Sequence, residues 1–500
     1  MPSREEASDG RGDSDDGGAK QAHFVFVPLM FGGHLIPSVD TALMVATHGA
    51  VATIVVTPSY AARVRRTVEL TTSGRFGASA GADVRVVALP LDCAAAGLAD
   101  GSDDIDRIGM ELELEYFRAL SLLREPLERH LRAAGAPYPT CVVSDFCLPW
   151  TQELAASLGV PRVCFFNLGA FSVLCQHNVN RYGAFDGVVG DDVAVVVPGL
   201  GDRRFEVTRA QAQAFLTGWD DYDDAVDRAL DAADGFVMNT FTGMEPEFVA
   251  AYAAARGKKV WTIGPVSLYH RHTMSLAARG RTADIDADEC IQWLDTKEPN
   301  SVVYVSFGSI THMDPKHVVE LGLGLEASGH QFIWVVSNTE LYGETVREFL
   351  HELAARVAGR GLVIRGWAPQ VLILSHVAVG GFVTHCGWNS ILEAAVAGLP
   401  VVTWPHFSDQ FLNEKMAVEV LGIGVSVGIT EQVDSQEEGK GNVAGREMVE
   451  KAIRSILDGG EEAEERRRRA RDLAEKARTT VQEGGSSRDN LFDFVQSFGG

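Results

Sequence analysis

Short apolar runs that alternate with helical patterns are the feature that most constrains the fold of this chain. In the first half the runs cover residues 23–29, 51–57, 84–89, 140–144, 161–167, 235–239 and 260–264, and in the second half residues 301–307, 332–336, 362–364 and 380–383. Continuous apolar runs are typical of strands buried on both faces, as in parallel sheets covered by helices. We therefore predict an α/β protein with two doubly wound, Rossmann-like parallel-sheet domains.

Changes in composition suggest the domain boundaries. Residues 1–21 are rich in Gly, Asp, Ser and Glu and are expected to form a disordered tail. Residues 22–265 form the predicted N-terminal domain. Residues 266–288 lack an apolar period and read as a linker. Residues 289–480 form the predicted C-terminal domain, and residues 481–500 end in a short helix.

Charge and cysteine content exclude some classes of partner. The net charge of −24 argues against nucleic acid or an anionic membrane as partner. We expect no secretory signal and no membrane span, since no apolar stretch has the required length or position. The seven cysteines are odd in number, lie mostly in apolar runs and lack metal-ligand spacing. They indicate reduced thiols in a cytoplasmic protein.

Residues 367–410 carry polar and aromatic side chains that a packed core does not need. The segment reads as a strand at 380–383, a turn, and a helix at 390–397, for which Asn389 or Ser390 would be the N-cap. The exposed amides and the dipole of a helix start favour an anion. His385, Asn389 and Ser390 add donors, so the turn suits a diphosphate.

Other residues of this segment fit the rest of a sugar nucleotide. Glu393 lies one turn into the helix, where a carboxylate can accept hydrogen bonds from two ribose hydroxyls. Trp367 offers a flat face for a base. Asp409 and Gln410 follow the next strand and are suited to sugar hydroxyls. The alternative is an ordinary strand–turn–helix unit with a capped helix.

Residues 367–410 resemble the signature box of plant UDP-sugar-dependent glycosyltransferases, which have the GT-B fold with two domains facing a cleft. The resemblance covers about residues 22–498. It implies that the N-terminal domain binds the acceptor, that the C-terminal domain binds the UDP-sugar, and that the last helix crosses back to the N-terminal domain. It adds Ala368 and Gln370 to the UDP contacts and Trp388 to the sugar contacts. Ser309, in the turn after residues 301–307, is a further phosphate donor.

The turn at residues 30–34 follows the first strand and leads into a helix in which Pro37 is expected to lie in the first turn. Its GGH sequence does not match GxGxxG, so a dinucleotide site is not indicated. The resemblance implies that His34 is the catalytic histidine, although Gly32 stands where the family usually has glutamine. It also implies that Asp145, at the end of residues 140–144, pairs with His34. The alternative for Asp145 is a helix N-cap.

The acceptor and the sugar are assigned to neighbouring strand ends. The resemblance places Asn167 near the sugar 6-hydroxyl. The glutamine at position 410 resembles family members that use UDP-glucose. We predict that Phe31, Phe146, His406 and Phe407 form the acceptor pocket. Trp150, Phe166 and Phe171 are alternatives as pocket or core residues, and core is favoured for at least half of the aromatic residues at these strand ends.

A metal site is not predicted. Asp221, Tyr222 and Asp223 form a DxD pattern, but acidic residues in the first turn of a helix simply oppose the helix dipole. A basic run at residues 466–469 follows four glutamates and indicates a solvated helix rather than a nucleic-acid site.

These patterns predict an inverting glycosyltransferase that uses UDP-glucose without a cofactor. His34 would take the proton from the acceptor hydroxyl and Asp145 would orient it, giving a β-glycoside. The acceptor would be a small lipophilic flavonoid, terpenoid or other alcohol, and the protein a monomer. The alternative is a catalytically inactive protein that binds a UDP-sugar or small molecule. A glycosidase would need two opposed carboxylates, and no such pair is evident. An epimerase or dehydrogenase would need a dinucleotide fingerprint.

Overall fold

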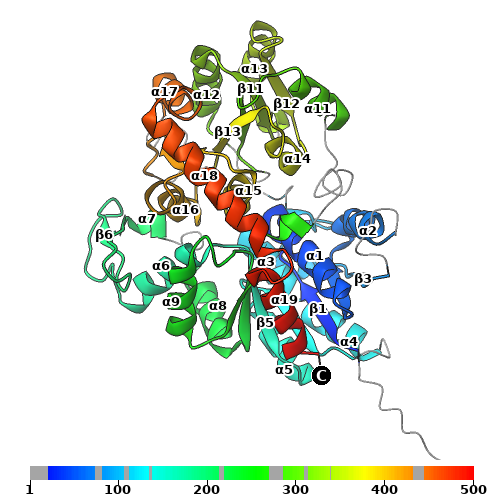
Figure 1. Cartoon of the computed structure of the whole chain (residues 1–500). Helices are drawn as coiled ribbons and strands as arrows, with labels where there is room; N and C mark the ends of the chain where they lie inside the picture. Colours follow the sequence, from blue (N-terminus) through cyan, green and yellow to red (C-terminus); the bar gives the residue numbers. More distant parts are fainter. Residues whose placement is uncertain are drawn as a thin grey trace, which may run out of the picture.

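The computed structural model describes residues 21–73, 81–105, 108, 112–133, 138–212, 219–269, 285, 287–308, 313–337, 339–431 and 444–499. Within these ranges the chain forms two lobes, each built on a parallel sheet and its helices (Figure 1). This is the predicted α/β class with two doubly wound, Rossmann-like domains, arranged as in GT-B. Most of the predicted tail and linker falls outside the described residues.

The first lobe contains a seven-stranded sheet in the order β3-β2-β1-β4-β5-β8-β9, with every pair parallel. The two edge strands β3 and β9 are partly exposed, whereas every residue of the five inner strands is buried. Full burial explains why these segments appear as continuous apolar runs. The strands are β1 (His23–Val27), β2 (Val51–Val56), β3 (Asp83–Ala88), β4 (Cys141–Asp145), β5 (Arg162–Phe166), β8 (Gly235–Met238) and β9 (Val260–Thr262).

Helices connect these parallel strands. They are α1 (Gly32–Thr47), α2 (Pro58–Thr72), α3 (Glu113–Ser121), α4 (Arg124–Ala133), α5 (Trp150–Leu158), α6 (Ala170–Arg181), α8 (Asp220–Ala232) and α9 (Pro246–Arg256). A short antiparallel pair, β6 (Val195–Val196) and β7 (Glu206–Val207), is followed by α7 (Arg209–Ala212).

Helix α1 begins earlier than the sequence pattern suggested. It starts at Gly32, so Pro37 lies inside the helix and not in its first turn. Proline has no N–H, and the carbonyl four residues earlier, that of Gly33, therefore lacks its normal helical donor. The prediction of a first-turn proline was wrong because the glycines at the helix start hid the true boundary. The free carbonyl at Gly33 becomes important below.

The second lobe contains a six-stranded parallel sheet in the order β12-β11-β10-β13-β14-β15. Its strands are β10 (Val302–Ser306), β11 (Gln331–Val336), β12 (Gly361–Arg365), β13 (Val379–Thr384), β14 (Val401–Thr403) and β15 (Gly424–Ser426). The helices are α11 (Ala287–Asp295), α12 (Pro315–Ser328), α13 (Glu344–Arg356), α14 (Gln370–Leu374), α15 (Trp388–Ala397), α16 (Gln410–Lys415) and α17 (Arg446–Leu457). A π-helical turn, Met416–Val420, extends α16.

Each sheet has a point where the strand order reverses. In the first sheet β1 lies beside β4, and in the second β10 lies beside β13. Ligands of doubly wound sheets bind outside the carboxyl ends of the strands at such points. His34 follows β1, Asp145 ends β4 and His385 follows β13, so the topology places the predicted site residues at both reversal points.

The last two helices join the lobes. α18 (Glu461–Thr480) packs on α15, and α19 (Ser486–Ser497) packs on β9 of the first sheet (Figure 1). Asp493 accepts hydrogen bonds from Trp261 Nε1 (2.6 Å) and Lys259 Nζ (2.5 Å). Ser487 Oγ donates to the carbonyl of Gly264 at 2.6 Å. The end of the chain therefore returns to the N-terminal lobe.

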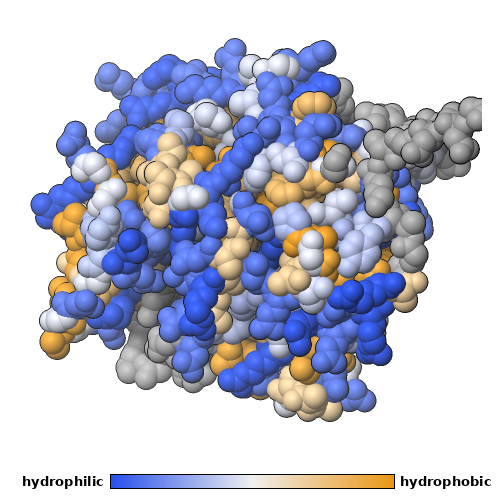
Figure 2. All heavy atoms as spheres, turned by 90° about the horizontal axis from the view of Figure 1, so that it is seen from below, coloured by the Kyte–Doolittle hydropathy of each residue, from blue (hydrophilic) through white to orange (hydrophobic). Residues whose placement is uncertain are grey.

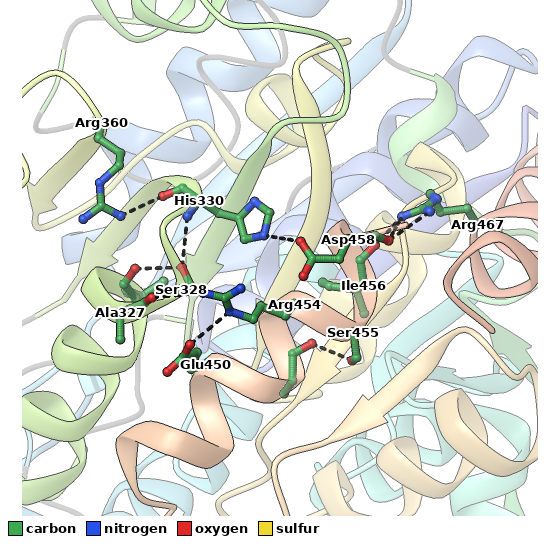
Figure 3. Close-up of polar contacts among 12 residues, drawn as sticks. Ala327, Ser328, His330, Arg360, Glu450, Arg454, Ser455, Ile456, Asp458 and Arg467 are labelled. Carbon is green, nitrogen blue, oxygen red and sulfur yellow. Dashed lines mark hydrogen bonds and ion pairs between the residues drawn. The ribbon is translucent and has the colours of Figure 1, made fainter. Parts of the chain in front are cut away.

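Figure 3 shows a polar network where α12 and α17 meet the start of β11. His330 Nε2 lies 2.9 Å from Asp458 Oδ1, and Arg360 Nη1 donates to the His330 carbonyl at 3.2 Å. Arg467 donates to the main-chain carbonyl of Asp458, which ties the start of α18 to the same corner. Exposed ion pairs of this kind add little stability individually, but they fix the corner between these elements.

The surface is mixed in polarity. On the face seen in Figure 2, hydrophilic residues dominate and hydrophobic residues appear in small groups between them. In the part of the chain that the structure describes, no helix is both long and apolar enough to cross a bilayer. The large apolar side chains are concentrated against the two sheets.

Candidate active site

A cavity of about 300 Å³ lies between the carboxyl ends of the two sheets. Residues from both lobes line it, so the two reversal points face one shared space. The predicted site residues that line it are Phe31, His34, Phe146, Asn167, Trp367, Ala368, Gln370, His385, Trp388, Asn389, Ser390, Glu393, Phe407, Asp409 and Gln410. Asp145 lies behind His34, His406 is buried behind the wall, and Ser309 falls outside the described residues.

His34 and Asp145 form a hydrogen-bonded pair. His34 Nδ1 lies 2.7 Å from Asp145 Oδ2, and the carboxylate is fully buried while the imidazole keeps partial exposure. Burial alone would lower the pKa of His34, but the charge of Asp145 and the hydrogen bond to it raise that pKa above its ordinary value. Burial would raise the pKa of Asp145, yet His34 and the Cys147 hydrogen bonds lower it. With Nδ1 directed at Asp145, Nε2 is the free nitrogen of the ring.

Cys147 supports this pair and was not singled out from the sequence. Its thiol donates to Asp145 Oδ1 at 3.0 Å, and its main-chain N–H donates to the same oxygen at 3.4 Å. Burial and the nearby Asp145 charge raise the thiol pKa well above its usual value, so the sulfur carries its proton. The second oxygen of Asp145 is thereby left to His34. The spacing Asp-x-Cys at a strand end is the signal that the sequence offered.

The geometry also bears on two alternatives. α5 begins at Trp150 after Pro149 and has no side-chain cap, so Asp145 does not act as its N-cap. His34, Asp145 and Cys147 are the one cluster among the described residues with ligand atoms close enough for a metal ion. Their atoms are hydrogen-bonded to one another and the thiol is protonated, which is the chemistry of a proton relay rather than of a thiolate metal site.

The turn before α15 forms the opposite wall. α15 starts at Trp388 with Gly387 as N-cap and no side-chain cap, so the predicted capping by Asn389 or Ser390 was wrong. Both residues instead lie within the first turn, where Asn389 bonds to Gly33 and Asn239 and Ser390 bonds to Gln370. The positive end of the helix dipole remains directed toward the cavity, as an anion site requires.

His385 is held in a tight, half-buried position beside this helix start. Burial lowers its pKa to about 4, so the imidazole is neutral at physiological pH and can donate one N–H without carrying charge. A Cβ at Gly308, where φ is +76°, would lie 3.0 Å from the ring. Cys386, the next residue, adopts φ of +67° although it is not glycine. Such strain is found at ligand sites, where the surroundings hold the backbone in place.

Gln370 connects two predicted nucleotide contacts. Its Nε2 donates to Glu393 Oε2 at 2.9 Å and to Ser390 Oγ at 3.3 Å. Trp367 and Ala368, immediately before α14, line the same end of the cavity. This is the arrangement that a ribose and base would meet.

Asn389 joins the two lobes. Its Nδ2 donates to the main-chain carbonyl of Gly33 at 2.5 Å, and its Oδ1 accepts from Asn239 Nδ2 at 3.3 Å. The Gly33 carbonyl is the one that Pro37 leaves without a helical donor. Asn239, after β8, was not predicted from the sequence, and its polar character at a strand end was the available signal.

Trp388 also contacts the first lobe. Its indole Nε1 donates to the Asn239 carbonyl at 2.8 Å, and its six-membered ring packs so closely on Gly169 that a Cβ there would lie 2.7 Å away. The indole nitrogen is therefore already bonded to the first lobe. Trp388 also lines the cavity.

The loop before α16 orients two predicted sugar contacts. Gln410 Oε1 accepts from the main-chain N–H groups of His406 (2.8 Å) and Phe407 (3.3 Å), which leaves its amide N–H groups for a ligand. Asp409 Oδ2 accepts from Asn413 Nδ2 at 2.7 Å, and burial raises the Asp409 pKa to about 6. Asn413 Oδ1 in turn accepts from Ser172 Oγ of the first lobe at 2.6 Å. Neither Asn413 nor Ser172 was predicted.

Asn167 lies at the end of β5, close to the dyad. Its Nδ2 donates to the His34 carbonyl at 3.4 Å, while its buried Oδ1 has no hydrogen-bond partner among the described residues. An unpaired buried oxygen at a cavity wall is a site where a ligand hydroxyl can donate.

The acceptor side of the cavity is aromatic. Phe146 stacks on Phe166 with ring centroids 4.9 Å apart, and Phe31 lies 6.4 Å from Phe117. Phe117, Trp219 and Glu113 complete this wall and were not predicted. Of the aromatic residues left open as pocket or core, Trp150, Phe166 and Phe171 are buried and do not line the cavity.

The predicted acceptor contact by His406 is not present. Its side chain is 3% exposed, its Nδ1 lies 3.0 Å from the Trp404 carbonyl, and its ring packs 5.4 Å from Phe307. Burial lowers its pKa to about 3. The loop turns between His406 and Phe407, so the phenylalanine faces the cavity and the histidine faces the core of the second lobe.

Comparison with known proteins places this geometry in context. The family model described as "UDP-glucoronosyl and UDP-glucosyl transferase" matches residues 272–437. UDP-glycosyltransferase 73C5 of Arabidopsis thaliana is 40% identical over 481 residues, which are 95% of this chain and 96% of that protein. UDP-glycosyltransferase 73C12 of Barbarea vulgaris is 41% identical over 482 residues, with the same coverage.

Solved structures are similar over nearly the whole chain. Glycyrrhiza uralensis UGT73P12 complexed with glycyrrhetinic acid 3-O-monoglucuronide has a TM-score of 0.85 at 32% identity, and 96% of each chain is covered. A ugt transferase from Siraitia grosvenorii in complex with UDP has a TM-score of 0.73 at 25% identity, covering 96% of this chain and 100% of that one.

Proposed function

Because this chain belongs to the plant UDP-glycosyltransferases, which transfer a glycosyl group from a UDP-sugar to an acceptor, we propose that it moves glucose to a hydroxyl of a small lipophilic acceptor with inversion. The product would be a β-glucoside. We further propose that His34 is the general base, that Asp145 orients it, and that the enzyme acts in the cytoplasm as a monomer. Seven free, buried cysteines support a reducing compartment.

The observation that carries this proposal is the dyad at the wall of a cavity shared with the UDP box. The acceptor oxygen attacks the anomeric carbon as the bond from that carbon to the diphosphate oxygen breaks. The hydroxyl proton passes to His34 Nε2, and the bonding electrons leave with UDP. Asp145 stabilises the imidazolium that forms, since the pair is 2.7 Å apart and the carboxylate is buried.

The leaving group would be held by the second lobe. The start of α15, which includes Asn389, supplies main-chain donors, and His385 and Ser390 add side-chain donors as negative charge develops on the diphosphate. Glu393, oriented by Gln370, is suited to the ribose, and Trp367 and Ala368 to the base. Attack by an oxygen held at His34 from the opposite face implies inversion at the anomeric carbon. The relay does not require a metal or other cofactor.

Polar residues of the cavity support the choice of glucose, and its aromatic wall supports the choice of acceptor. Asp409 and Gln410 offer a carboxyl group and amide donors to sugar hydroxyls, and Asn167 offers an unpaired oxygen. The aromatic wall of Phe31, Phe146 and Phe407 favours flavonoid, terpenoid and other lipophilic alcohols. One similar structure carries glycyrrhetinic acid 3-O-monoglucuronide, and another of Arabidopsis thaliana carries quercetin, which supports an acceptor of this size.

The direct test is transfer by the purified chain. UDP-glucose is incubated with a panel of phenols and triterpenes, UDP release is measured, and products are identified by mass spectrometry and by the anomeric coupling constant. A β-glucoside is expected. UDP-glucose binding with no product from any acceptor would instead support the inactive binding protein, and an α-linked product would overturn inversion.

A further inference from the structure

A carboxyl group lies in the apolar part of the cavity. Glu113 is the first residue of α3 and lines the cavity together with Phe117, which is four residues later and therefore on the same face of the helix. The ring centroid of Phe117 lies 6.4 Å from that of Phe31, 5.2 Å from that of Trp219 and 5.4 Å from that of Tyr222. Glu113 is thus the acidic residue of an otherwise aromatic wall.

Glu113 differs from the other acidic residues that line the cavity. Asp409 is hydrogen-bonded to Asn413, and Glu393 is hydrogen-bonded to Gln370. For Glu113 the structure gives no hydrogen bond or ion pair with any described residue. Burial is the single cause acting on its pKa, which rises to about 7. Partial burial of a carboxyl group without a partner costs free energy, so a ligand hydroxyl that pairs with the half-buried Glu113 recovers part of that cost.

The wall connects this carboxyl group to the dyad. The ring centroids of His34 and Phe31 are 6.2 Å apart, those of Phe31 and Phe117 are 6.4 Å apart, and one helical turn separates Phe117 from Glu113. A rigid acceptor with its reacting hydroxyl at His34 Nε2 would lie along these rings. Its opposite end would then approach Glu113.

We infer that Glu113 forms an acceptor subsite for a second hydroxyl, located at the end of the acceptor opposite the one that receives the sugar. The inference rests on the proposed function and names its substrate class: rigid lipophilic molecules with hydrogen-bond donors at both ends. An acceptor with a carboxylate at the far end is disfavoured, because two carboxyl groups in a low-dielectric wall repel each other when both are ionised.

Three matched acceptors test the subsite: para,para′-dihydroxybiphenyl, para-hydroxybiphenyl, and the hydroxybiphenyl with a para′-carboxylate, with the terphenyl homologues as a longer set. The full-length protein is assayed with UDP-glucose, and KM and kcat are measured separately. For wild type, KM should be lowest for the diol and highest for the carboxylate. Glu113→Leu should raise KM for the diol about tenfold, toward that of the mono-ol, since it removes the hydrogen bond.

Glu113→Gln separates hydrogen bonding from charge. The amide can still accept a hydrogen bond, so the preference for the diol should largely persist, whereas the penalty on the carboxylate should fall. Glu115→Gln is the matched control, because Glu115 pairs with Arg118 at 3.6 Å on the same helix and does not line the cavity. It should leave the ranking of the three acceptors as in wild type.

The outcomes are distinguishable from failure of the proposed function. Suppose that wild type transfers sugar to all three acceptors and that Glu113→Leu leaves their KM ratios unchanged in both the biphenyl and terphenyl sets. The proposed Glu113 subsite is then rejected, while the proposed transferase function is retained. If wild type transfers to no acceptor in the wider phenol and triterpene panel, the proposed function itself fails. Melting temperatures of the variants exclude misfolding as the cause of a changed ratio.

Discussion

The side-chain amide of Asn389 donates a hydrogen bond to the main-chain carbonyl of Gly33, 356 residues away, at the wall of the cavity. The acceptor is free because Pro37 has no N–H to offer it. One lobe thus supplies the carbonyl and the other the donor, directly beside His34. The two halves of the reaction site are aligned through this contact.

Asn389→Ala should therefore reduce catalysis more than it reduces folding stability. The helix cannot replace the lost donor, so the hydrogen bond that aligns the lobes is lost at a cost of about 1 kcal/mol. This cost corresponds to a roughly fivefold decrease in kcat/KM. Steady-state kinetics and thermal unfolding would be compared. Because the Gly33 carbonyl can be rehydrated, a large fall in melting temperature would contradict an alignment role and indicate a structural one.

His34→Ala should reduce turnover by on the order of 10² to 10⁴ while UDP-sugar binding persists. The imidazole is the one base placed at the cavity wall with a buried carboxylate behind it, whereas the UDP box lies on the other lobe. Single-turnover rates and UDP calorimetry would measure the two properties separately. Turnover near the wild-type value would remove His34 as the base.

The dependence of kcat/KM on pH should report the coupling between His34 and Asp145. A general base at His34 would act only when neutral, and Asp145 raises the pKa of His34 above the ordinary value, so kcat/KM should rise with pH through that raised pKa. In Asp145→Asn the charge is lost while burial still lowers the pKa, so the acid limb should move to lower pH. The maximal rate should fall by roughly 10² or more, because the imidazolium loses its partner. An acid limb that does not move would contradict coupling of the two groups.

Gln410→His should shift donor preference from UDP-glucose toward UDP-galactose or UDP-arabinose. Gln410 Oε1 accepts two main-chain N–H groups, and an imidazole cannot reproduce both bonds together with the free amide donors. Competition between UDP-sugars gives the ranking directly. Gln410→Glu is the control that can keep both accepted bonds while a carboxylate oxygen replaces the amide donors. An unchanged ranking in Gln410→His would refute the sugar contact.

Glu393→Ala should weaken UDP binding itself by roughly tenfold to a hundredfold, as loss of a charged hydrogen-bond acceptor does. Gln370→Ala should have a smaller effect in the same direction, since Gln370 orients Glu393 through the 2.9 Å bond. Calorimetric titration with UDP measures both variants. Normal affinity in Glu393→Ala would exclude the ribose contact.

Sequence reasoning succeeded where a pattern is local. The continuous apolar runs located the parallel strands except β15, for which no strand was predicted, and the polar residues at their ends pointed to His34, Asp145 and His385. It failed at helix starts and at side-chain direction. α1 begins at Gly32 and α15 at Trp388, because glycine-rich turns do not mark the first helical residue. His406 and Phe407 are adjacent and equally apolar in context, so only the turn of the loop decides which one faces the cavity.

The sequence by itself determined the two sheets and the strand ends that line the cavity, because the burial of a strand is encoded in its own residues and parallel connections bring the carboxyl ends together. Only the tertiary structure decided which polar atoms are engaged by the protein and which are left for a ligand. The indole of Trp388 and the amide of Asn389 are engaged by the other lobe, whereas Glu113 has no hydrogen-bond or ion-pair partner among the described residues. Hydrogen-bond partners come from residues hundreds of positions away, and no local pattern specifies them.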